Sequence, residues 1–196
     1  SDVPMKTDHD NIKIYLIVVI LLQLIIIVFT GHLKQGFHVD EIFSFVFANS
    51  YENPKFDQGM YNTWFQPEYF SDMVKVSASH RFSYKTTYQN QTRDVHPPLY
   101  YFLLHTVCSI YPENFSIWFG LIINIALFVI CNLFVYLIGV KLFNNFSLAL
   151  IPVIVWGFSA GALSTVIFIR MYMLLTSLVV ITFYLHILLF TNDTSK

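Results

Sequence analysis

The chain has 196 residues, of which 56% are hydrophobic and only 12% are charged, and its mean hydropathy is +0.58. Soluble domains carry about 25% charged residues, so the composition excludes an ordinary soluble globular protein and predicts an all-α integral membrane protein. The formal net charge is −1. Nucleic-acid-binding proteins carry an excess of basic residues, so no nucleic-acid partner is expected.

The first apolar segment, residues 12–30, predicts a transmembrane helix. It contains one charge, Lys13 at its start, and one interior amide, Gln23. About 20 residues at a rise of 1.5 Å per residue cross the hydrocarbon core of a membrane. A signal peptide has a shorter apolar region followed by a cleavage site of small residues. We therefore favour an uncleaved membrane anchor, preceded by a cytoplasmic tail of residues 1–11.

Residues 31–115 are predicted to form a long extracytoplasmic loop that carries juxtamembrane helices. This loop holds six basic and eight acidic residues together with many aromatic residues, which favour the headgroup zone. Its apolar segment 97–111 is too short to cross the membrane. Pro97 and Pro98 suit the first turn of a helix, so we expect an interfacial helix here. A loop of this length is where function most often resides.

Three further transmembrane helices are predicted in the last part of the chain, which gives about four in all. Their expected ranges are 116–140, 146–169 and 171–190. An arginine at the bilayer centre costs a few kcal/mol, so Arg170 is expected at a membrane face between two spans. The polar residues within these spans are expected to make hydrogen bonds between helices; they are Asn124, Asn132 and His186.

The predicted spans give one consistent topology. The amino terminus is cytoplasmic, the long loop is outside, and Lys141 returns to the inside, as the positive-inside rule prefers. The residues that then reach the same outer face are Asp40, Glu41, Asp94, His96 and Arg170. If residues 97–111 formed a full span instead, Arg170 would lie on the opposite side of the membrane.

Each of these residues also has a simple structural explanation. Asp40 and Glu41, in "FHVDEIFSF", suit the first turn of a helix, where acids interact favourably with the helix dipole. Asp94 suits the cap of the helix that begins near Pro97, His96 suits an ordinary histidine at the membrane interface, and Arg170 suits the end of a membrane helix. Together, however, they provide a carboxylate for general-base catalysis and a cation for binding a phosphate group.

Four motifs, in their order along the chain, resemble the amino-terminal part of the GT-C fold membrane glycosyltransferases, especially the protein O-mannosyltransferase and aminoarabinose transferase group. The motifs are "VDEIFSF", "DVHPPLYYFLLH", "YLIGVKLF" and "IRMYMLLT". The resemblance implies that Asp40 is the catalytic base, which deprotonates an acceptor hydroxyl as the hydroxyl attacks the anomeric carbon with inversion. It also implies substrate-binding roles, shaping the site or contacting the phosphate, for Glu41, Asp94, His96, Arg170 and Tyr172.

The same resemblance implies a polyprenyl-phosphate sugar donor, a protein, lipid or glycan acceptor, contacts with membrane lipids, and no cofactor. It implies a multi-pass protein of the bacterial plasma membrane with its active site on the outer face. Members of this group have many more spans, and the chain ends in "TNDTSK" directly after an apolar segment. We therefore expect residues 191–196 to be a truncated tail and the isolated chain to be inactive.

Two departures from the family and two alternatives accompany this interpretation. Trp118 stands where many relatives have an arginine, and Phe168 and Ile169 stand where many have an acidic residue.

The alternative function is a non-catalytic membrane assembly subunit or a transporter component, since transporters place polar groups in broken helices. A divalent metal could use the carboxylates and His96 as ligands, but no spacing supports it and no metal site is predicted.

The topology predicts which side of the membrane each site residue faces. Single cysteines introduced at positions 40, 94 and 170 are expected to react with a membrane-impermeant thiol reagent from the same side. Labelling from opposite sides would refute the shared outer face.

Overall fold

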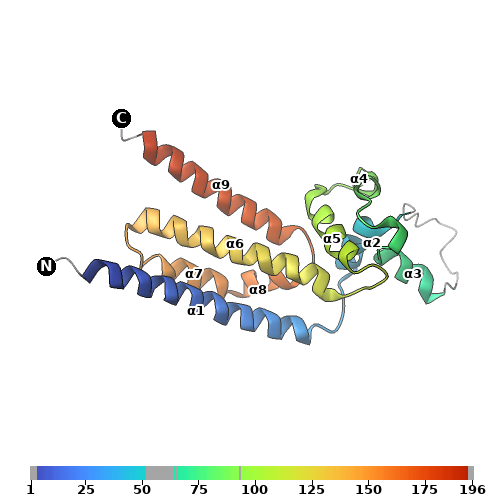
Figure 1. The fold of residues 1–196 in the computed structure, drawn as a ribbon, viewed down its shortest axis with the longest axis horizontal. Helices are drawn as coiled ribbons and strands as arrows, with labels where there is room; N and C mark the ends of the chain where they lie inside the picture. The colour runs from blue at the N-terminus through green and yellow to red at the C-terminus, as the bar shows by residue number, and fades with distance from the viewer. Residues whose placement is uncertain (1–3, 52–63, 65, 93, 194–196) are drawn as a thin grey trace. The chain divides into compact units, whose positions relative to one another are not determined.

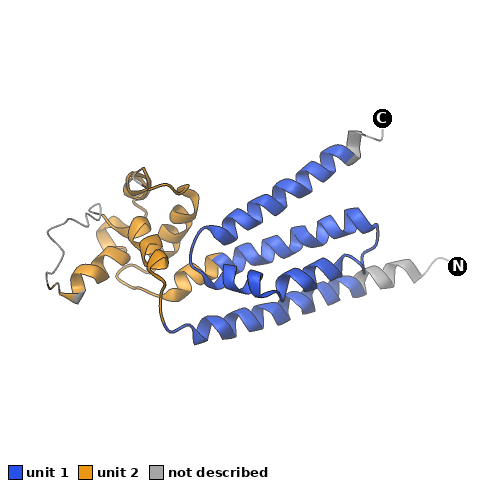
Figure 2. Cartoon of the chain, turned by 180° about the vertical axis from the view of Figure 1, so that it is seen from behind, with its two compact units in different colours: residues 1–35, 124–196 blue, residues 36–123 orange. Residues whose placement is uncertain are grey.

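The computed structural model describes residues 4–51, 64, 66–92 and 94–193, and the regular structure within these residues is entirely helical. The helices are α1 Pro4–Leu33, α2 Val39–Asn49, α3 Pro67–Val74, η2 Ala78–His80, α4 Tyr84–Gln91, α5 Leu99–Ile110, α6 Ile117–Phe143, α7 Leu150–Gly157, α8 Ala160–Ile167 and α9 Tyr172–Asp193 (Figure 1). The chain divides into two compact units (Figure 2). Unit 1 comprises residues 1–35 and 124–196, and unit 2 comprises residues 36–123.

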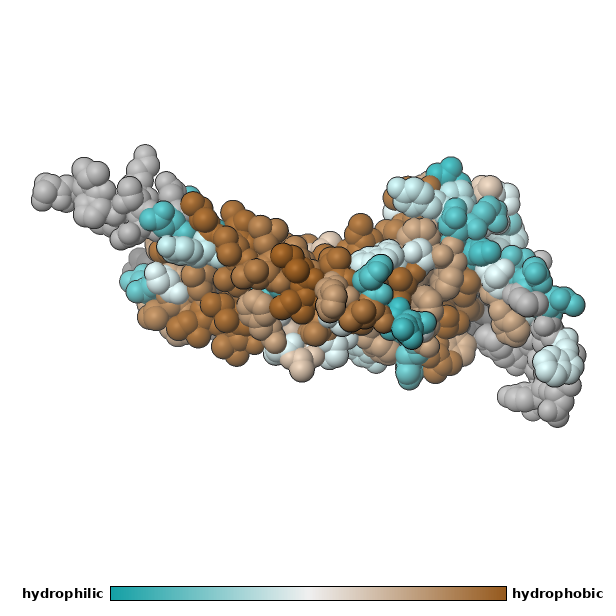
Figure 3. Space-filling view, turned by 90° about the horizontal axis from the view of Figure 1, so that it is seen from below, coloured by the Kyte–Doolittle hydropathy of each residue, from teal (hydrophilic) through white to brown (hydrophobic). Residues whose placement is uncertain are grey.

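The predicted class, an all-α membrane protein, is confirmed. Among the residues that the structure describes, three helices are long and apolar enough to cross a membrane, over Asn11–Leu33, Ile117–Phe143 and Tyr172–Phe190. Helices suit lipid because they satisfy every backbone hydrogen bond within one segment. Hydrophobic side chains cover much of the helical surface of unit 1 (Figure 3). The helix α5 is apolar but has only 12 residues, fewer than a crossing needs.

The predicted span 146–169 is divided into two short helices, α7 and α8, which are bent by 60° at the break. Ser159 causes the division, because its backbone leaves the helical region (φ −71°, ψ 147°) and its Oγ accepts a hydrogen bond from the N–H of Ala162 at 3.0 Å. A serine in this arrangement is a strong helix N-cap. A hydropathy window does not register such a cap, because the residues on both sides remain apolar.

The bent pair runs along α6 in the opposite direction instead of turning back on itself. The pair begins next to Gly139 of α6. Ala149 lies so close to this glycine that a Cβ at position 139 would be in tight contact with the Cα of Ala149. The pair ends next to Asn124, whose Nδ2 donates hydrogen bonds to the carbonyls of Val166 and Phe168, both at 2.9 Å. Residues 124 and 139 of a helix are separated by about 22 Å along its axis. Counted as one bent span, the pair brings the candidate membrane spans among the described residues from three to four.

Helix α1 runs parallel to this bent pair. Leu16 and Ile20 of α1 pack in a cluster with Val153 of α7, whereas Ile27 packs in a cluster with Ala162 of α8. Both helices therefore advance in the same direction. The carboxyl-terminal end of α1 consequently lies at the same end of unit 1 as the end of α8 and the part of α6 that begins at residue 124.

Within the bundle, Gln23 joins α1 to α7. Its side chain is buried, and its Nε2 donates a hydrogen bond to the carbonyl of Val153 at 3.0 Å. Gly157, one turn further along α7, has no side chain where this amide lies, and a Cβ there would overlap the Nε2, Cδ and Oε1 atoms of Gln23. A larger residue at position 157 would therefore have to displace the Gln23 amide.

The substitution Gly157→Ala is expected to destabilise the bundle, because the added methyl group displaces the Gln23 amide from Val153. Overpacking of this kind costs about 1–3 kcal/mol, which thermal unfolding in detergent would measure. Gly161→Ala is the matched control, since the nearest atom that its Cβ would meet is Ser159 Oγ at 3.9 Å. Equal melting temperatures for the two variants would contradict the packing role of Gly157.

Candidate functional site

The acid pair predicted as the centre of the site lies in the first turn of α2, in unit 2. His38 is the N-cap residue of this helix, and its Nδ1 accepts a hydrogen bond from the backbone N–H of Asp40 at 3.2 Å. The backbone N–H of His38 in turn donates to Glu41 Oε2 at 2.7 Å. This is a reciprocal capping box, with histidine in the position that serine or threonine usually occupies.

The two adjacent carboxylates have different environments. Glu41 is fully buried, and one of its oxygens accepts the hydrogen bond from His38 N–H. Asp40, in contrast, leaves 42% of its side chain exposed to solvent. Of the two, Glu41 therefore fixes the start of the helix, and Asp40 is the carboxylate that faces solvent.

An aromatic cluster holds the chain that enters α2. The ring of Phe37 lies 5.1 Å from that of Phe115 and 5.9 Å from that of Phe45, measured between centroids. The rings of Phe45 and Phe115 are 4.9 Å apart in an edge-to-face arrangement, and Phe45 is fully buried. Such pairs contribute about 0.5–1.5 kcal/mol each beyond area burial. They restrict the position of His38 and Asp40.

The other end of α2 is held by polar side chains from later in the chain. Thr87 Oγ1 of α4 donates to the carbonyl of Ala48 at 2.9 Å, and Asn90 Nδ2 donates to the carbonyl of Ser50 at 2.8 Å. These bonds satisfy carbonyl groups that the end of a helix leaves without partners. Asn49 adds a link through its Nδ2 to the carbonyl of Val74 at 2.7 Å. Both ends of the helix that carries Asp40 are thus fixed.

Asp94 and His96 form a second group within unit 2. The two side chains are 14% and 20% exposed, and His96 Nδ1 lies 2.8 Å from Asp94 Oδ2. Tyr101 of α5 donates its hydroxyl to the same oxygen at 3.5 Å. Asp94 is not the cap of α5, because the N-cap residue is Pro98 and it has no side-chain cap bond. The contact with the Asp94 carboxylate orients the His96 ring.

Arg170 and Tyr172 form a third group, in unit 1. Arg170 lies in the connection between α8 and α9, is only 7% exposed, and donates its backbone N–H to the carbonyl of Phe168 at 2.8 Å. Tyr172 is the first residue of α9, and its ring stacks on that of Phe168 at 5.9 Å. Both residues lie at the end of unit 1 where α1 ends.

The polar residues predicted to link the membrane helices behave differently from one another. Asn124 joins α6 to the end of α8, as expected. Asn132 Nδ2 instead donates to Phe128 O in its own helix, and His186 Nδ1 is paired with Thr182 O one turn earlier in α9. The prediction of interhelical bonds is therefore wrong for Asn132 and His186. Ser177, which was not predicted, does link two helices, because its Oγ donates to Leu127 O of α6 at 3.0 Å.

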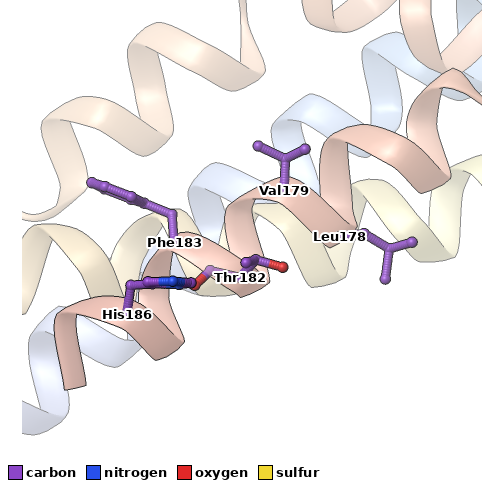
Figure 4. A pocket seen from close by; sticks show the side chains of 5 residues that line it. All are labelled: Leu178, Val179, Thr182, Phe183 and His186. Atoms are coloured by element: carbon purple, nitrogen blue, oxygen red, sulfur yellow. The ribbon is translucent and has the colours of Figure 1, made fainter. Parts of the chain in front are cut away.

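A hollow of about 330 Å³ lies along the side of α9 (Figure 4). Its lining comes from this helix alone and is mostly apolar: Leu178, Val179, Thr182, Phe183 and His186. It contains none of the predicted site residues and no carboxylate. Within the described part of the chain, no three His, Cys, Asp or Glu side chains are grouped as ligands for a metal ion.

A buried polar group on α5 supports α2 from behind. His105 is buried, and its Nδ1 lies 3.3 Å from Asn49 Oδ1. Burial lowers the pKa of His105 below its ordinary value of 6.5, and a hydrogen bond with the backbone of Ala48 opposes this effect only in part. Burial also raises the pKa of the neighbouring Cys108 thiol to about 11, against the effect of a hydrogen bond with Asn49. Both groups are therefore neutral at physiological pH.

The sequence interpretation did not single out His38, Tyr101 or His105 as part of this region. His38 had a detectable signal, because it stands three residues before Glu41, the spacing of a capping box. Tyr101 lies in the same motif as its partner Asp94, but no local pattern indicates their contact, and the partner of His105, Asn49, is 56 positions away. No family model, curated protein or solved structure matches this chain. Fold and site together define an integral membrane protein with a helical unit inserted between its first two spans.

Acid is expected to destabilise the fold through His105. Because its folded-state pKa is lowered, the unfolded chain binds this proton more tightly, so stability is highest above pH 6.5 and falls as the pH drops through the folded-state pKa. Melting temperatures at pH 7.5 and pH 5 would measure the loss. The variant His105→Gln should lose less stability between these pH values than the wild type, and an equal loss would contradict this role.

Proposed function

We propose that this chain belongs to a membrane glycosyltransferase that transfers a sugar from a polyprenyl-phosphate donor to an acceptor hydroxyl at the outer membrane face, with inversion. The observation that carries the proposal is the division of the acid pair at the start of α2. Asp40 is exposed and held at a capped helix start, whereas Glu41 is buried as part of the cap. This is the arrangement expected of a positioned general base.

The order of the motifs along the chain provides further support. The "DE" pair opens the first helix after the first span, and "DVHPPLYY" places an Asp–His pair before α5. In the proposed enzyme Asp40 removes the proton of the acceptor hydroxyl, and Glu41 maintains the helix start that positions it. Asp94 and His96 bind substrate through the exposed edge of the imidazole ring.

Arg170 and Tyr172 are proposed to bind the phosphate of the donor. Their location at one end of unit 1 is suited to a ligand whose phosphate lies at headgroup level and whose polyprenyl chain lies in the membrane. The end of unit 1 that carries them is the end at which α1 finishes. The chain continues into residues 36–123 from this same end of unit 1.

One observation favours the alternative, a transporter component: the bent pair α7–α8 is a broken span. However, the polar side chains near it bond to the backbone of neighbouring helices. Gln23 bonds to Val153, and Asn124 bonds to Val166 and Phe168. Hydrogen bonds of this kind hold membrane helices together, and the break itself has a sufficient cause in the cap at Ser159. We therefore place glycosyl transfer first.

The pair Asp40→Asn and Glu41→Gln tests the proposal in the full-length protein. Asp40→Asn is expected to reduce sugar transfer from a lipid-linked donor about 10²–10⁴-fold, the range for loss of a general base. Glu41→Gln should retain most of the activity, because glutamine also completes a capping box. Transfer of labelled sugar is the measurement, with melting temperature as the control for folding.

Undiminished turnover in Asp40→Asn would refute the role of Asp40. Absence of transfer by the wild-type full-length protein with every polyprenyl-phosphate sugar tested would refute the proposed function itself.

A further inference from the structure

The two faces of α5 have the reverse of the polarity of a helix on a water-soluble protein, which is apolar toward the core and polar toward solvent. The buried face carries Tyr100, Tyr101, Leu104, His105, Cys108 and Ser109. The outward face carries Leu99, Phe102, Leu103, Thr106, Val107 and Ile110. Tyrosine, histidine and serine side chains therefore point inward, whereas the outward face is aliphatic and aromatic except at Thr106.

The polar groups of the buried face bond to the rest of unit 2. Ser109 Oγ accepts a hydrogen bond from the backbone N–H of Phe82 at 3.0 Å, and His105 Nδ1 lies 3.3 Å from Asn49 Oδ1. Buried polar groups need such partners. Hydrogen bonding thus explains why the polar residues of α5 face the interior, and it leaves the apolar residues of the helix on the outside.

The outward face is exposed along the whole length of the helix. The side chains of Leu99, Leu103 and Ile110 are 48%, 36% and 51% exposed. Residues 97–112 contain no Asp, Glu, Lys or Arg, so no charge interrupts this surface. A contiguous exposed apolar surface marks contact with a membrane or with another protein.

Thr106, the one polar residue of the outward face, uses its hydroxyl within unit 2. Its Oγ1 donates to the carbonyl of Phe102 in the same helix at 2.7 Å, and it lies 3.0 Å from the hydroxyl of Tyr84. Because the threonine hydrogen is directed at Phe102, the tyrosine is the donor of the second bond. Tyrosine at the edge of an apolar surface is typical of the headgroup zone of a membrane.

The carboxyl-terminal end of α5 is attached to a membrane span. The ring of Tyr111, which follows the helix, stacks on that of Phe119 with centroids 6.0 Å apart and planes inclined by 10°. Phe119 lies in the first turn of α6, in the part of this helix that belongs to unit 2. The 27 residues of α6 are about 40 Å long, whereas the hydrocarbon core is about 30 Å thick. The first turn of α6, and with it the end of α5, is therefore expected at headgroup level.

We propose that α5 lies along the membrane surface with its outward face in contact with phospholipid acyl chains. Its 12 residues extend about 18 Å, and the apolar face of an interfacial helix enters the boundary of headgroups and acyl chains by about 5–10 Å. An isolated interfacial helix turns its polar face to water, whereas α5 turns its polar face to the interior of unit 2. Lipid is the expected partner because the chain continues from this helix directly into a membrane span. This surface is independent of sugar transfer.

Spin labels on single introduced cysteines test this surface in the full-length protein, reconstituted in phosphatidylcholine vesicles. Oxygen concentrates in hydrocarbon and a nickel chelate stays in water, so the ratio of the two collision rates reports contact with lipid. Labels at positions 99, 103 and 110 are expected to have the high ratio of a label at Ile122, which is 57% exposed on α6. A label at Asp72, an exposed acid of α3, should have the low ratio of an aqueous position. The two native cysteines are buried, and the protein without an introduced cysteine supplies the background.

High accessibility of positions 99, 103 and 110 to the nickel chelate would overturn the proposal, because the outward face would then be in water. Labels that neither reagent reaches would also overturn it, since a protein surface such as a second copy of the chain would then cover the face.

Photolabelling tests the protein without any substitution. Phosphatidylcholine with a carbene precursor on its acyl chain is expected to label residues 99–110 as well as residues 117–143, which mass spectrometry of the peptides would show. Labelling of residues 117–143 alone would contradict a lipid-facing α5. Neither measurement uses sugar transfer, so the outcome is separate from that of the proposed function.

Discussion

The hydrogen bond from the backbone N–H of His38 to the buried carboxylate of Glu41 is the constraint on which the arrangement of unit 2 depends. A carboxylate is costly to bury unless it is hydrogen-bonded, and at this place it also meets the positive end of the helix dipole. Because Glu41 occupies the interior, its neighbour Asp40 is turned outward. The aromatic cluster of Phe37, Phe45 and Phe115 then fixes the approach of the chain. A bond that is purely structural thus determines which of the two acids faces solvent.

Much of the architecture could be predicted from the sequence, because hydropathy identifies a membrane helix without knowledge of its neighbours. The long apolar runs around residues 12–30, 116–140 and 171–190 correspond to helices of sufficient length. The short segment 97–111 likewise corresponds to a 12-residue helix. The break in 146–169 was missed because it depends on the side chain of Ser159 and its bond to Ala162, which an averaged hydropathy does not contain.

The sequence indicated the candidate site residues and, through the family resemblance, assigned different roles to Asp40 and Glu41. Composition alone cannot show which of two adjacent acids faces inward, because only packing decides this. The supporting contacts join residues far apart in sequence: His105 meets Asn49 across 56 positions, and Asn90 meets Ser50 across 40. Such pairs leave no local pattern. The capping box at His38 is the exception, since both of its members lie within one turn.

The bond between Gln23 and Val153 has a consequence for how the protein is made. The two residues are separated by 130 positions, so at about 5–20 residues per second the ribosome needs about 7–26 s after making the first span to supply its polar partner. During that interval α1 is in the membrane with a side-chain amide that has no bond to α7. The first span is therefore in place before its helix packing is complete, and final assembly of the bundle follows synthesis of the third hydrophobic segment.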